Sequence, residues 1–351
     1  MAGIADVAAR AGVSKATASR ALTGSGYVSE ATRQRVRAVA DELGYVPSTS
    51  AVSLATGRTQ NIGVVMPYVN RWFFAEVLEG IQQSLLERGL DLTLYDARPG
   101  TAGRERIFGD FLARKRFDGL IAVGLEPGDH ELEQLTQIGR PIVSVVGTGD
   151  ESSLIAIDDV YAARRATEHL IGLGHTQIAF LGGGSDSHWT HVDKQRLSGY
   201  DSAMAEAGLS AHRRHVRSEV SMPAGYRAAV DLLGDARLRP TAIVAVCDEV
   251  AVGAIIAARR LGILVPGDLS VVGIDDHEYA DMFALTTLQQ LPREQGRMAV
   301  EMLVERIADP DTPVQHIRMH ASLIVRASTS AVDAHSSAVR DADLIRESGV
   351  E

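Results

Sequence analysis

Basic and hydroxyl-bearing residues recur at close spacing near the start of the chain. The exposed face of this segment would carry Lys15, Ala16, Ser19 and Arg20, and its first turn would carry Ser14 and Thr17. Lysine and arginine can donate hydrogen bonds to the O6 and N7 atoms of guanine, and an alanine methyl can contact the methyl group of thymine. Hydroxyl groups at the positive N-terminus of a helix suit phosphate. These residue types predict a helix that contacts DNA in the major groove.

Two short helices joined by a tight turn are predicted to hold this face. The first has apolar residues at helical spacing, Ile4, Val7, Ala8 and Ala11, and stops at Gly12. Ser14 is a suitable N-cap for a second helix that runs to about Leu22. Ser29 can open a third helix, which Gly44 ends. This arrangement is a helix-turn-helix, whose second helix can enter a major groove.

The charge of the chain is divided unevenly along its length. The whole chain has a formal net charge of −10, which by itself disfavours a nucleic-acid partner. Residues 1–60 nevertheless contain seven basic groups against four acidic ones: Arg10, Lys15, Arg20, Arg33, Arg35, Arg37 and Arg58 against Asp6, Glu30, Asp41 and Glu42. The basic end can therefore meet phosphate while the acidic remainder stays away from it.

From Asn61 onward the sequence alternates β-rich apolar runs with amphipathic segments of helix length. The predicted strands cover residues 62–66, 92–95, 120–123, 142–146, 178–181, 216–220, 242–246 and 269–274. Such alternation is typical of a parallel α/β sheet, and its restart near Ile178 predicts a second sheet of similar size. Two lobes of this kind bind small molecules in the crevice outside the carboxyl ends of their strands.

Several kinds of chemistry lack the residues they need. Cys247 is the single cysteine, so neither an intramolecular disulfide nor a cysteine-based metal cluster can form. The glycine run 182–184 lacks the dinucleotide-binding spacing, and His188, His191 and Asp193 are too few for a metal site. No nucleophile motif and no membrane-length apolar run occurs. We expect no cofactor, no metal and no enzymatic activity, in a soluble cytoplasmic protein without a leader peptide.

The N-terminal segment closely resembles the headpiece of the lactose/galactose repressor family (LacI type). The resemblance continues through Val28-Ser29, Thr32-Arg33, Leu43-Gly44-Tyr45, Asp118-Gly119-Leu120-Ile121, Arg196-Leu197-Ser198-Gly199-Tyr200 and Leu285-Thr286-Thr287, to about residue 328. It implies an all-α helix-turn-helix headpiece over 1–46, a hinge helix or linker over 47–59, and an α/β two-lobed periplasmic-binding-protein-like sensor over 60–329. The N-lobe would span about 60–161 plus a late return segment, and the C-lobe about 162–290. Residues 330–351 are expected to form a disordered tail.

The hinge prediction rests on the same resemblance. Residues 48–55 would form a helix on operator binding and wedge Leu54 into the minor groove, which kinks the duplex by unstacking a base step. Tyr27 is added to the predicted DNA contacts. Three residues depart from the family pattern: Ser48 and Val52 replace the usual hinge asparagine and arginine, and Thr23 replaces an asparagine after the recognition helix. Hinge contacts are therefore expected to be weaker, and the alternative is that Leu54 docks on the sensor.

The resemblance also assigns residues to the effector site. In the family an arginine and an aspartate grip the effector across the cleft, and these positions are Arg196 and Asp275 here. A structural ion pair is the alternative for each. Cys247-Asp248 stands where many family sugar sensors have asparagine followed by aspartate, and the lost amide weakens any specific sugar assignment.

Aromatic residues complete the predicted effector site. Phe73, and after it Trp72, follow the first strand and could face the apolar side of a sugar ring or a base, whereas Phe74 is as well suited to the core. Trp189 could close the other wall, although an exposed loop tryptophan is an equal alternative.

These predictions define a sequence-specific repressor. A homodimer would pair two headpieces on double-stranded operator DNA, and a small effector, with a sugar as the leading class, would change operator affinity by shifting the lobes and the hinge. The alternative from another class is a free-standing sugar-binding protein without DNA function, which would need no headpiece.

Overall fold

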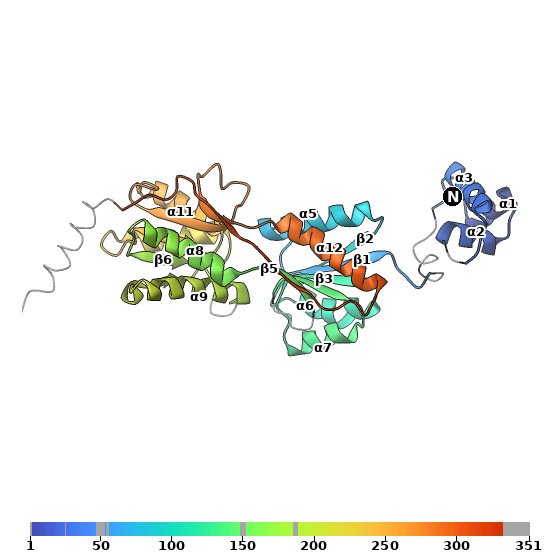
Figure 1. Cartoon of the computed structure of the whole chain (residues 1–351), viewed down its shortest axis with the longest axis horizontal. Helices are drawn as coiled ribbons and strands as arrows, with labels where there is room; N and C mark the ends of the chain where they lie inside the picture. The colour runs from blue at the N-terminus through green and yellow to red at the C-terminus, as the bar shows by residue number, and fades with distance from the viewer. Residues whose placement is uncertain are drawn as a thin grey trace, which may run out of the picture.

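The computed structural model describes residues 2–24, 26–46, 53, 56–147, 152–184 and 189–332. These residues form a helical headpiece followed by two α/β lobes, as Figure 1 shows. No described helix is long and apolar enough to cross a membrane.

The headpiece is a three-helix unit built on small side chains. It contains α1 (Ile4–Arg10), α2 (Lys15–Thr23) and α3 (Glu30–Glu42). The predicted caps are confirmed, because Ser14 and Ser29 accept hydrogen bonds from the backbone N–H groups of Thr17 and Thr32. The core of the headpiece comprises Val7, Ala8, Ala11, Ala18, Ala21, Val36 and Ala40. Alanine at these contacts lets the helices approach closely, which fixes the face that α2 presents.

The N-lobe contains a six-stranded, all-parallel sheet. Its strands are β1 (Asn61–Met66), β2 (Asp91–Asp96), β3 (Gly119–Leu125), β4 (Ile142–Gly147), β5 (Ser153–Ile157) and β11 (His316–Met319), in the order β11-β5-β4-β3-β1-β2. The helices α5 (Trp72–Glu87) and α12 (Pro292–Ala308) cover one face, while α6 (Ala102–Arg106), η1 (Ile107–Phe111), η2 (Leu112–Arg114) and α7 (Asp129–Gln137) lie on the other. Successive side chains of the central strands point alternately into these two cores. Because both faces of the sheet are buried, the sequences of these strands are continuous apolar runs.

The C-lobe repeats this topology with one strand reversed. Its strands are β6 (Ile178–Leu181), β7 (Arg214–Val216), β8 (Ala242–Ala245), β9 (Ser270–Asp275), β10 (Thr286–Gln289) and β12 (Ser322–Ile324), in the order β12-β10-β9-β8-β6-β7. Only β12 is antiparallel to its neighbour among the described strands of this sheet. Its helices are α8 (Asp159–Gly172), α9 (His191–Glu206), η3 (Ser210–His212), α10 (Met222–Gly234) and α11 (Asp248–Arg260).

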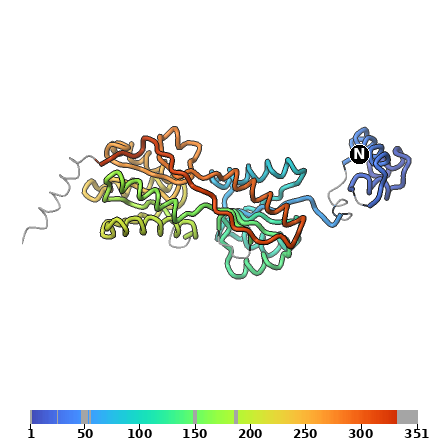
Figure 2. Tube along the Cα trace, in the orientation of Figure 1, coloured from blue at the N-terminus to red at the C-terminus, as the bar shows by residue number. Residues whose placement is uncertain are grey.

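The chain crosses between the lobes three times within the described residues. The crossovers lie between β5 and α8, between β10 and α12, and between β11 and β12. Figure 2 shows the last one within the long red segment that also contains β11 and β12. Helix α8 begins at Asp159 and packs in the C-lobe core, so the N-lobe ends about three residues before the predicted residue 161.

Two further sequence predictions need correction. The strand predicted over 216–220 is wrong, because the edge strand β7 pairs with β6 only through residues 214–216. The predicted tail begins too early, since Ser330 donates a backbone hydrogen bond to Ser270 Oγ and Val332 donates one to Leu173 O. The remainder of that tail lies outside the described residues.

His175 ties the end of the described chain to the C-lobe. Its Nδ1 lies 2.9 Å from Thr241 Oγ1, and its Nε2 lies 2.9 Å from Ser270 Oγ and 3.1 Å from Ser330 O. Burial lowers the pKa of His175 below its ordinary value of 6.5. The folded chain therefore favours the neutral imidazole.

We expect His175→Gln to flatten the dependence of stability on pH. In the wild type, the unfolded chain binds a proton at His175 more readily than the folded chain does, so this contribution is complete above about pH 6.5 and is lost as the pH falls. Urea unfolding of both proteins between about pH 5 and 8 measures the difference. Parallel profiles would contradict the assignment of His175 as a buried neutral group.

Candidate functional site

The exposed face of α2 carries the predicted DNA contacts. Lys15, Ala16 and Arg20 are exposed, whereas Thr17 and Ser19 are half-buried. Ala18 and Ala21 are fully buried against the other two helices, so they fix the rotation of α2 about its axis. The basic and small side chains therefore lie on one accessible face, as a major-groove contact requires.

The turn before α2 leaves the N-terminus of that helix open. Gly12 has a φ of +66°, a conformation that glycine adopts without strain, and Val13 donates a hydrogen bond of 3.0 Å to Ala8 O. Ser14 Oγ accepts the Thr17 N–H at 3.0 Å and lies 2.9 Å from Thr17 Oγ1. The hydroxyl groups and the positive end of α2 thus form a surface suited to a phosphate.

Tyr27 and Leu54 are the two remaining predicted DNA contacts. Tyr27 is 94% exposed beyond the C-terminus of α2 and is free to contact a ligand of the headpiece. The adjacent Gly26 lies against Arg20, because a Cβ placed on it would be 3.3 Å from Arg20 Cδ. Leu54, the predicted minor-groove wedge, lies outside the described residues.

Arg196 is the centre of a buried polar cluster in the C-lobe. Its Nε donates to Asp159 Oδ1 at 2.8 Å and its Nη1 donates to Val246 O at 2.6 Å. Its Nη2 lies 3.9 Å from Asp275 Oδ1. Burial raises the pKa of Asp159 more than the Arg196 charge lowers it. Burial alone would lower the pKa of Arg196, but the neighbouring carboxylates outweigh it and raise that pKa. The guanidinium is thus already bound within the C-lobe and can offer a ligand only part of its donor set.

Asp275 and Asp248 form the acidic side of this cluster. Asp275 ends β9 with a φ of +136°, and its Oδ1 accepts a hydrogen bond of 2.6 Å from Gln290 Nε2. Asp248 opens α11 and accepts hydrogen bonds from Thr287 Oγ1 at 2.7 Å and from the His277 N–H at 2.9 Å. Burial, followed for Asp248 by the nearby Asp275 charge, raises the pKa of both carboxyl groups. Asp248 therefore holds the loop after β9, whereas Asp275 lies closer to Arg196.

The predicted aromatic effector contacts Trp72 and Phe73 lie in different surroundings. Trp72 begins α5 in the N-lobe and stacks on His277 of the C-lobe, with ring centroids 4.8 Å apart. The Nε1 atom of Trp72 is buried and has no hydrogen-bond partner among the described residues. Phe73 packs against the N-lobe core and edge-on to Phe74, at 5.6 Å. Trp72 is therefore the aromatic residue that joins the lobes.

Cys247 lies beside the Arg196 cluster, whereas Trp189 lies near the β7 edge of the C-lobe sheet. Trp189 stacks on His215 at 5.5 Å, with the Arg217 guanidinium 5.2 Å from its ring. Cys247 is buried at the start of α11, and this burial raises the pKa of its thiol well above the ordinary value. Trp189 is thus supported by the β7 edge, and Cys247 is a neutral, apolar neighbour of Arg196.

A hollow of about 360 Å³ lies between the lobes beside Asp159. Val146 and Gly147 contribute the N-lobe side of this hollow, and Asp159, His191 and Gln195 contribute the C-lobe side. Nearby, Glu126 of the N-lobe accepts a hydrogen bond of 2.5 Å from the His191 N–H. The space is within the size range of small-molecule sites and is bounded by both lobes.

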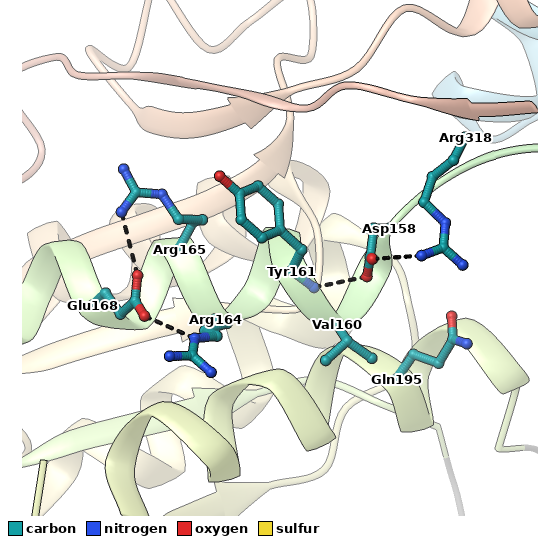
Figure 3. A pocket seen from close by; sticks show the side chains of 8 residues that line it. All are labelled: Asp158, Val160, Tyr161, Arg164, Arg165, Glu168, Gln195 and Arg318. Atoms are coloured by element: carbon teal, nitrogen blue, oxygen red, sulfur yellow. Dashed lines mark hydrogen bonds and ion pairs between the residues drawn. The ribbon is translucent and has the colours of Figure 1, made fainter. Parts of the chain in front are cut away.

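Consecutive carboxylates connect this hollow to the crossovers. Figure 3 shows Asp158 between Arg318 and the backbone of Tyr161, with hydrogen bonds of 3.0 and 2.9 Å. Asp158 therefore links two crossover segments, while the next residue, Asp159, binds Arg196. A displacement of Arg196 would therefore act directly on the crossover between β5 and α8.

Sequence reasoning missed Asp159, His277 and Gln290. The Asp158-Asp159 pair before an amphipathic helix indicates an N-cap, and Asp158 is that N-cap. Nothing in the spacing indicates that Asp159 meets Arg196. His277 and Gln290 are brought to the cluster by the sheet register and the loop after β9. No group of His, Cys, Asp and Glu in the described chain is arranged to hold a metal ion.

Two family models match the chain. Residues 3–48 match the model for bacterial regulatory proteins of the lacI family, and residues 167–329 match a periplasmic binding protein-like domain. The HTH-type transcriptional repressor PurR of Proteus mirabilis (strain HI4320) is 35% identical over 338 residues, which cover 94% of this chain and 97% of that protein.

Solved structures agree with this likeness. A lac repressor dimer bound to operator and the anti-inducer ONPF has a TM-score of 0.82 and 26% identity, covering 94% of this chain and 99% of that one. A complex of the transcriptional regulator CelR with cellobiose has a TM-score of 0.66 and 30% identity, covering 93% and 100%.

The headpiece and the two lobes together define a DNA-binding transcriptional regulator with a small-molecule sensor. The chain belongs to the lacI family of bacterial regulatory proteins. The sequence-based prediction of family and fold class is confirmed.

The two neighbouring ion pairs should differ sharply in their effect on stability. Arg196→Ala leaves Asp159 buried without its cation, so we expect the free energy of unfolding to fall by about 3–5 kcal/mol. Arg318→Ala removes a side chain that is 74% exposed, and we expect a loss of at most about 1 kcal/mol. Urea unfolding at neutral pH measures both, and equal losses would show that the Arg196 pair is not the stronger constraint.

Proposed function

We propose that this protein acts in the cytoplasm as a homodimeric repressor that binds a pseudo-palindromic operator and is regulated by a small polar ligand held between its lobes. The observation that carries the proposal is the pairing of an exposed basic α2 face with a two-lobed sensor that has a buried arginine–aspartate cluster. Ligand binding changes operator affinity by stabilising one relation of the lobes over another.

The headpiece supports the DNA-binding half of this function. A single headpiece with a few base contacts binds weakly, so two copies on two half-sites are needed for useful affinity and specificity. The lac repressor structure that resembles this chain is a dimer on its operator. The base contacts fall to Lys15, Ala16, Ser19 and Arg20, and the phosphate contacts to Ser14 and Thr17.

The cleft supports the ligand-binding half. Asp275 and the remaining donor of Arg196 offer an acceptor and a donor, and the buried Nε1 of Trp72 offers a second donor. Such a donor set fits a ligand with several hydroxyl groups, and the similar CelR structure holds cellobiose. We therefore propose a sugar as the first ligand class to test, and we expect the protein to bind the sugar without converting it. A free-standing sugar-binding protein would leave the headpiece without a role.

The central experiment is a selection of genomic fragments by the purified full-length protein, with and without a pool of sugars at fixed salt. We expect enrichment of a palindrome whose recovery changes when one sugar is present. If a sugar releases the selected DNA from the protein, that sugar is an inducer. If the DNA is enriched only when the sugar is present, the sugar is a co-repressor. Failure to enrich any sequence under all conditions would overturn the proposal.

Arg20→Ala should weaken binding to the selected operator. A bidentate arginine–guanine contact contributes about 1–3 kcal/mol, so we expect the affinity to fall by roughly 5- to 150-fold. Arg237→Ala, which removes an exposed positive charge from the C-lobe, is the matched control and should bind normally. Fluorescence anisotropy with labelled operator measures both, and equal affinities of the two variants would contradict a specific role for Arg20.

Asp275→Asn should separate ligand response from operator binding. Arg196 lies 2.8 Å from Asp159 and 3.9 Å from Asp275, so the variant keeps the shorter ion pair and should fold and bind operator. Loss of the acceptor charge should weaken the response to the selected sugar at least tenfold. Glu278→Gln, at an exposed position in the same loop, is the control. The measurement is a titration of the preformed operator complex with the sugar, which gives the sugar concentration at half-maximal response. An unchanged concentration would exclude Asp275 from the ligand site.

A further inference from the structure

The segment that leads from the headpiece enters the N-lobe at a buried carboxylate. Asp118 Oδ1 accepts hydrogen bonds from the Thr59 N–H at 2.7 Å and from Thr59 Oγ1 at 3.0 Å. Asp118 Oδ2 accepts a third from the Gln60 N–H at 2.9 Å. Asp118 is 6% exposed, so these bonds form away from bulk water, where they are strong and costly to lose.

Two further hydrogen bonds lock the same two segments together. The Asp118 N–H donates to Asn61 O at 2.8 Å, and Asn61 Nδ2 donates to Arg116 O at 2.7 Å. Gln60 has a φ of +53°, a conformation that non-glycine residues adopt only where their surroundings hold them. We call the contacts of Thr59 and Gln60 with Asp118 the linker clamp.

The linker clamp is connected to the hollow between the lobes by a buried strand. Asp118 directly precedes β3, which is paired with β1 and β4 and is almost entirely buried. At the other end of β3, Gly124 lies against Phe74, since a Cβ on Gly124 would be 2.7 Å from the Phe74 ring. Phe74 and Trp72 belong to the first turn of α5, where Trp72 meets His277 of the C-lobe. At the same end of β3, Leu125 pairs with Gly147, which lines the hollow between the lobes. One rigid strand thus spans from the cleft wall to the linker.

We propose that Asp118 is a positioning residue that fixes the direction in which each N-lobe presents its linker and headpiece to DNA. This inference rests on the proposed function. When the lobes move, the linker clamp makes residues 59 and 60 move with the N-lobe and prevents them from rotating relative to it. The positions of the two N-lobes therefore set the separation of the two headpieces in a dimer. Without the clamp, residues 59 and 60 would no longer be held on the N-lobe, and the two headpieces would accept several half-site separations.

Limited proteolysis tests the linker clamp without reference to DNA. Arg58 is the only trypsin site between Arg37 and Arg71, and the bond that follows it leads directly into the clamped residues. In Asp118→Asn an amide N–H₂ faces the Gln60 N–H, which leaves donor against donor. We expect trypsin to release residues 1–58 at least tenfold faster from full-length Asp118→Asn than from the wild type, with mass spectrometry identifying the fragment.

Two variants accompany this measurement. Asp91→Asn removes an exposed carboxylate beside the linker whose side chain takes no part in the clamp, so it should be cleaved at the wild-type rate. Thr59→Val removes one of the three hydrogen bonds of the linker clamp, together with the longer contacts of Thr59 Oγ1 with the N and O atoms of Asn61, and leaves β3 unaltered. Its cleavage rate should lie between the other two. If Asp118→Asn fails to fold, the Thr59→Val comparison still decides whether the clamp restrains the linker.

Operator spacing then separates positioning from simple stability. Affinity is measured for the selected palindrome and for versions with one or two base pairs inserted or removed at its centre. The wild type should prefer one spacing by at least tenfold, and Asp118→Asn or Thr59→Val should flatten this preference. A general loss of stability would lower affinity at every spacing alike, and that result would overturn the inference, as would unchanged proteolysis. A wild type that binds no sequence would refute the proposed function instead, whatever the proteolysis shows.

Discussion

The buried guanidinium of Arg196 is the interaction on which the sensor depends. It joins the start of α8, the end of β8 and the end of β9, which reach this point from distant parts of the sequence. A charge at this depth is tolerable only because Asp159, Asp275 and a backbone carbonyl surround it. Its partner Asp159 begins α8 directly after the crossover from β5, so the same ion pair also anchors one of the segments that join the lobes.

The two lobes use one topology for different tasks. In the N-lobe, the strand ends remote from the cleft receive the linker, and Asp118 holds it there. In the C-lobe, the corresponding end is closed by His175 and by the last described residues, which seal the sheet. The repeated fold therefore carries a connection to the headpiece in one lobe and a cap in the other.

Much of this architecture is predictable from local sequence. The glycine turn at Gly12 and the serine caps of α2 and α3 are local signals, and the structure confirms them. The apolar runs that form β1, β3 and β8 are buried on both faces, which makes their composition distinctive. The short edge strand β7 is misplaced by the sequence because His215 and Arg217 alternate with residues of no clear pattern.

The candidate site was only partly predictable, because its partners are fixed by tertiary packing. Family resemblance indicates Arg196 and Asp275, and the structure brings their side chains to 3.9 Å. It does not indicate that Asp159 occupies the guanidinium, or that His277 covers Trp72, since both depend on how the lobes and loops meet. Trp189 is drawn toward His215 by stacking, which no spacing rule anticipates.

The distribution of tryptophan has a practical consequence. The chain contains two tryptophans, one in each lobe, and each indole stacks on a histidine. The headpiece contains none, so the tryptophan emission of the protein originates entirely in the sensor. Because the Trp72 ring meets an imidazole of the opposite lobe, its intrinsic fluorescence is an optical gauge of lobe separation that needs no attached dye.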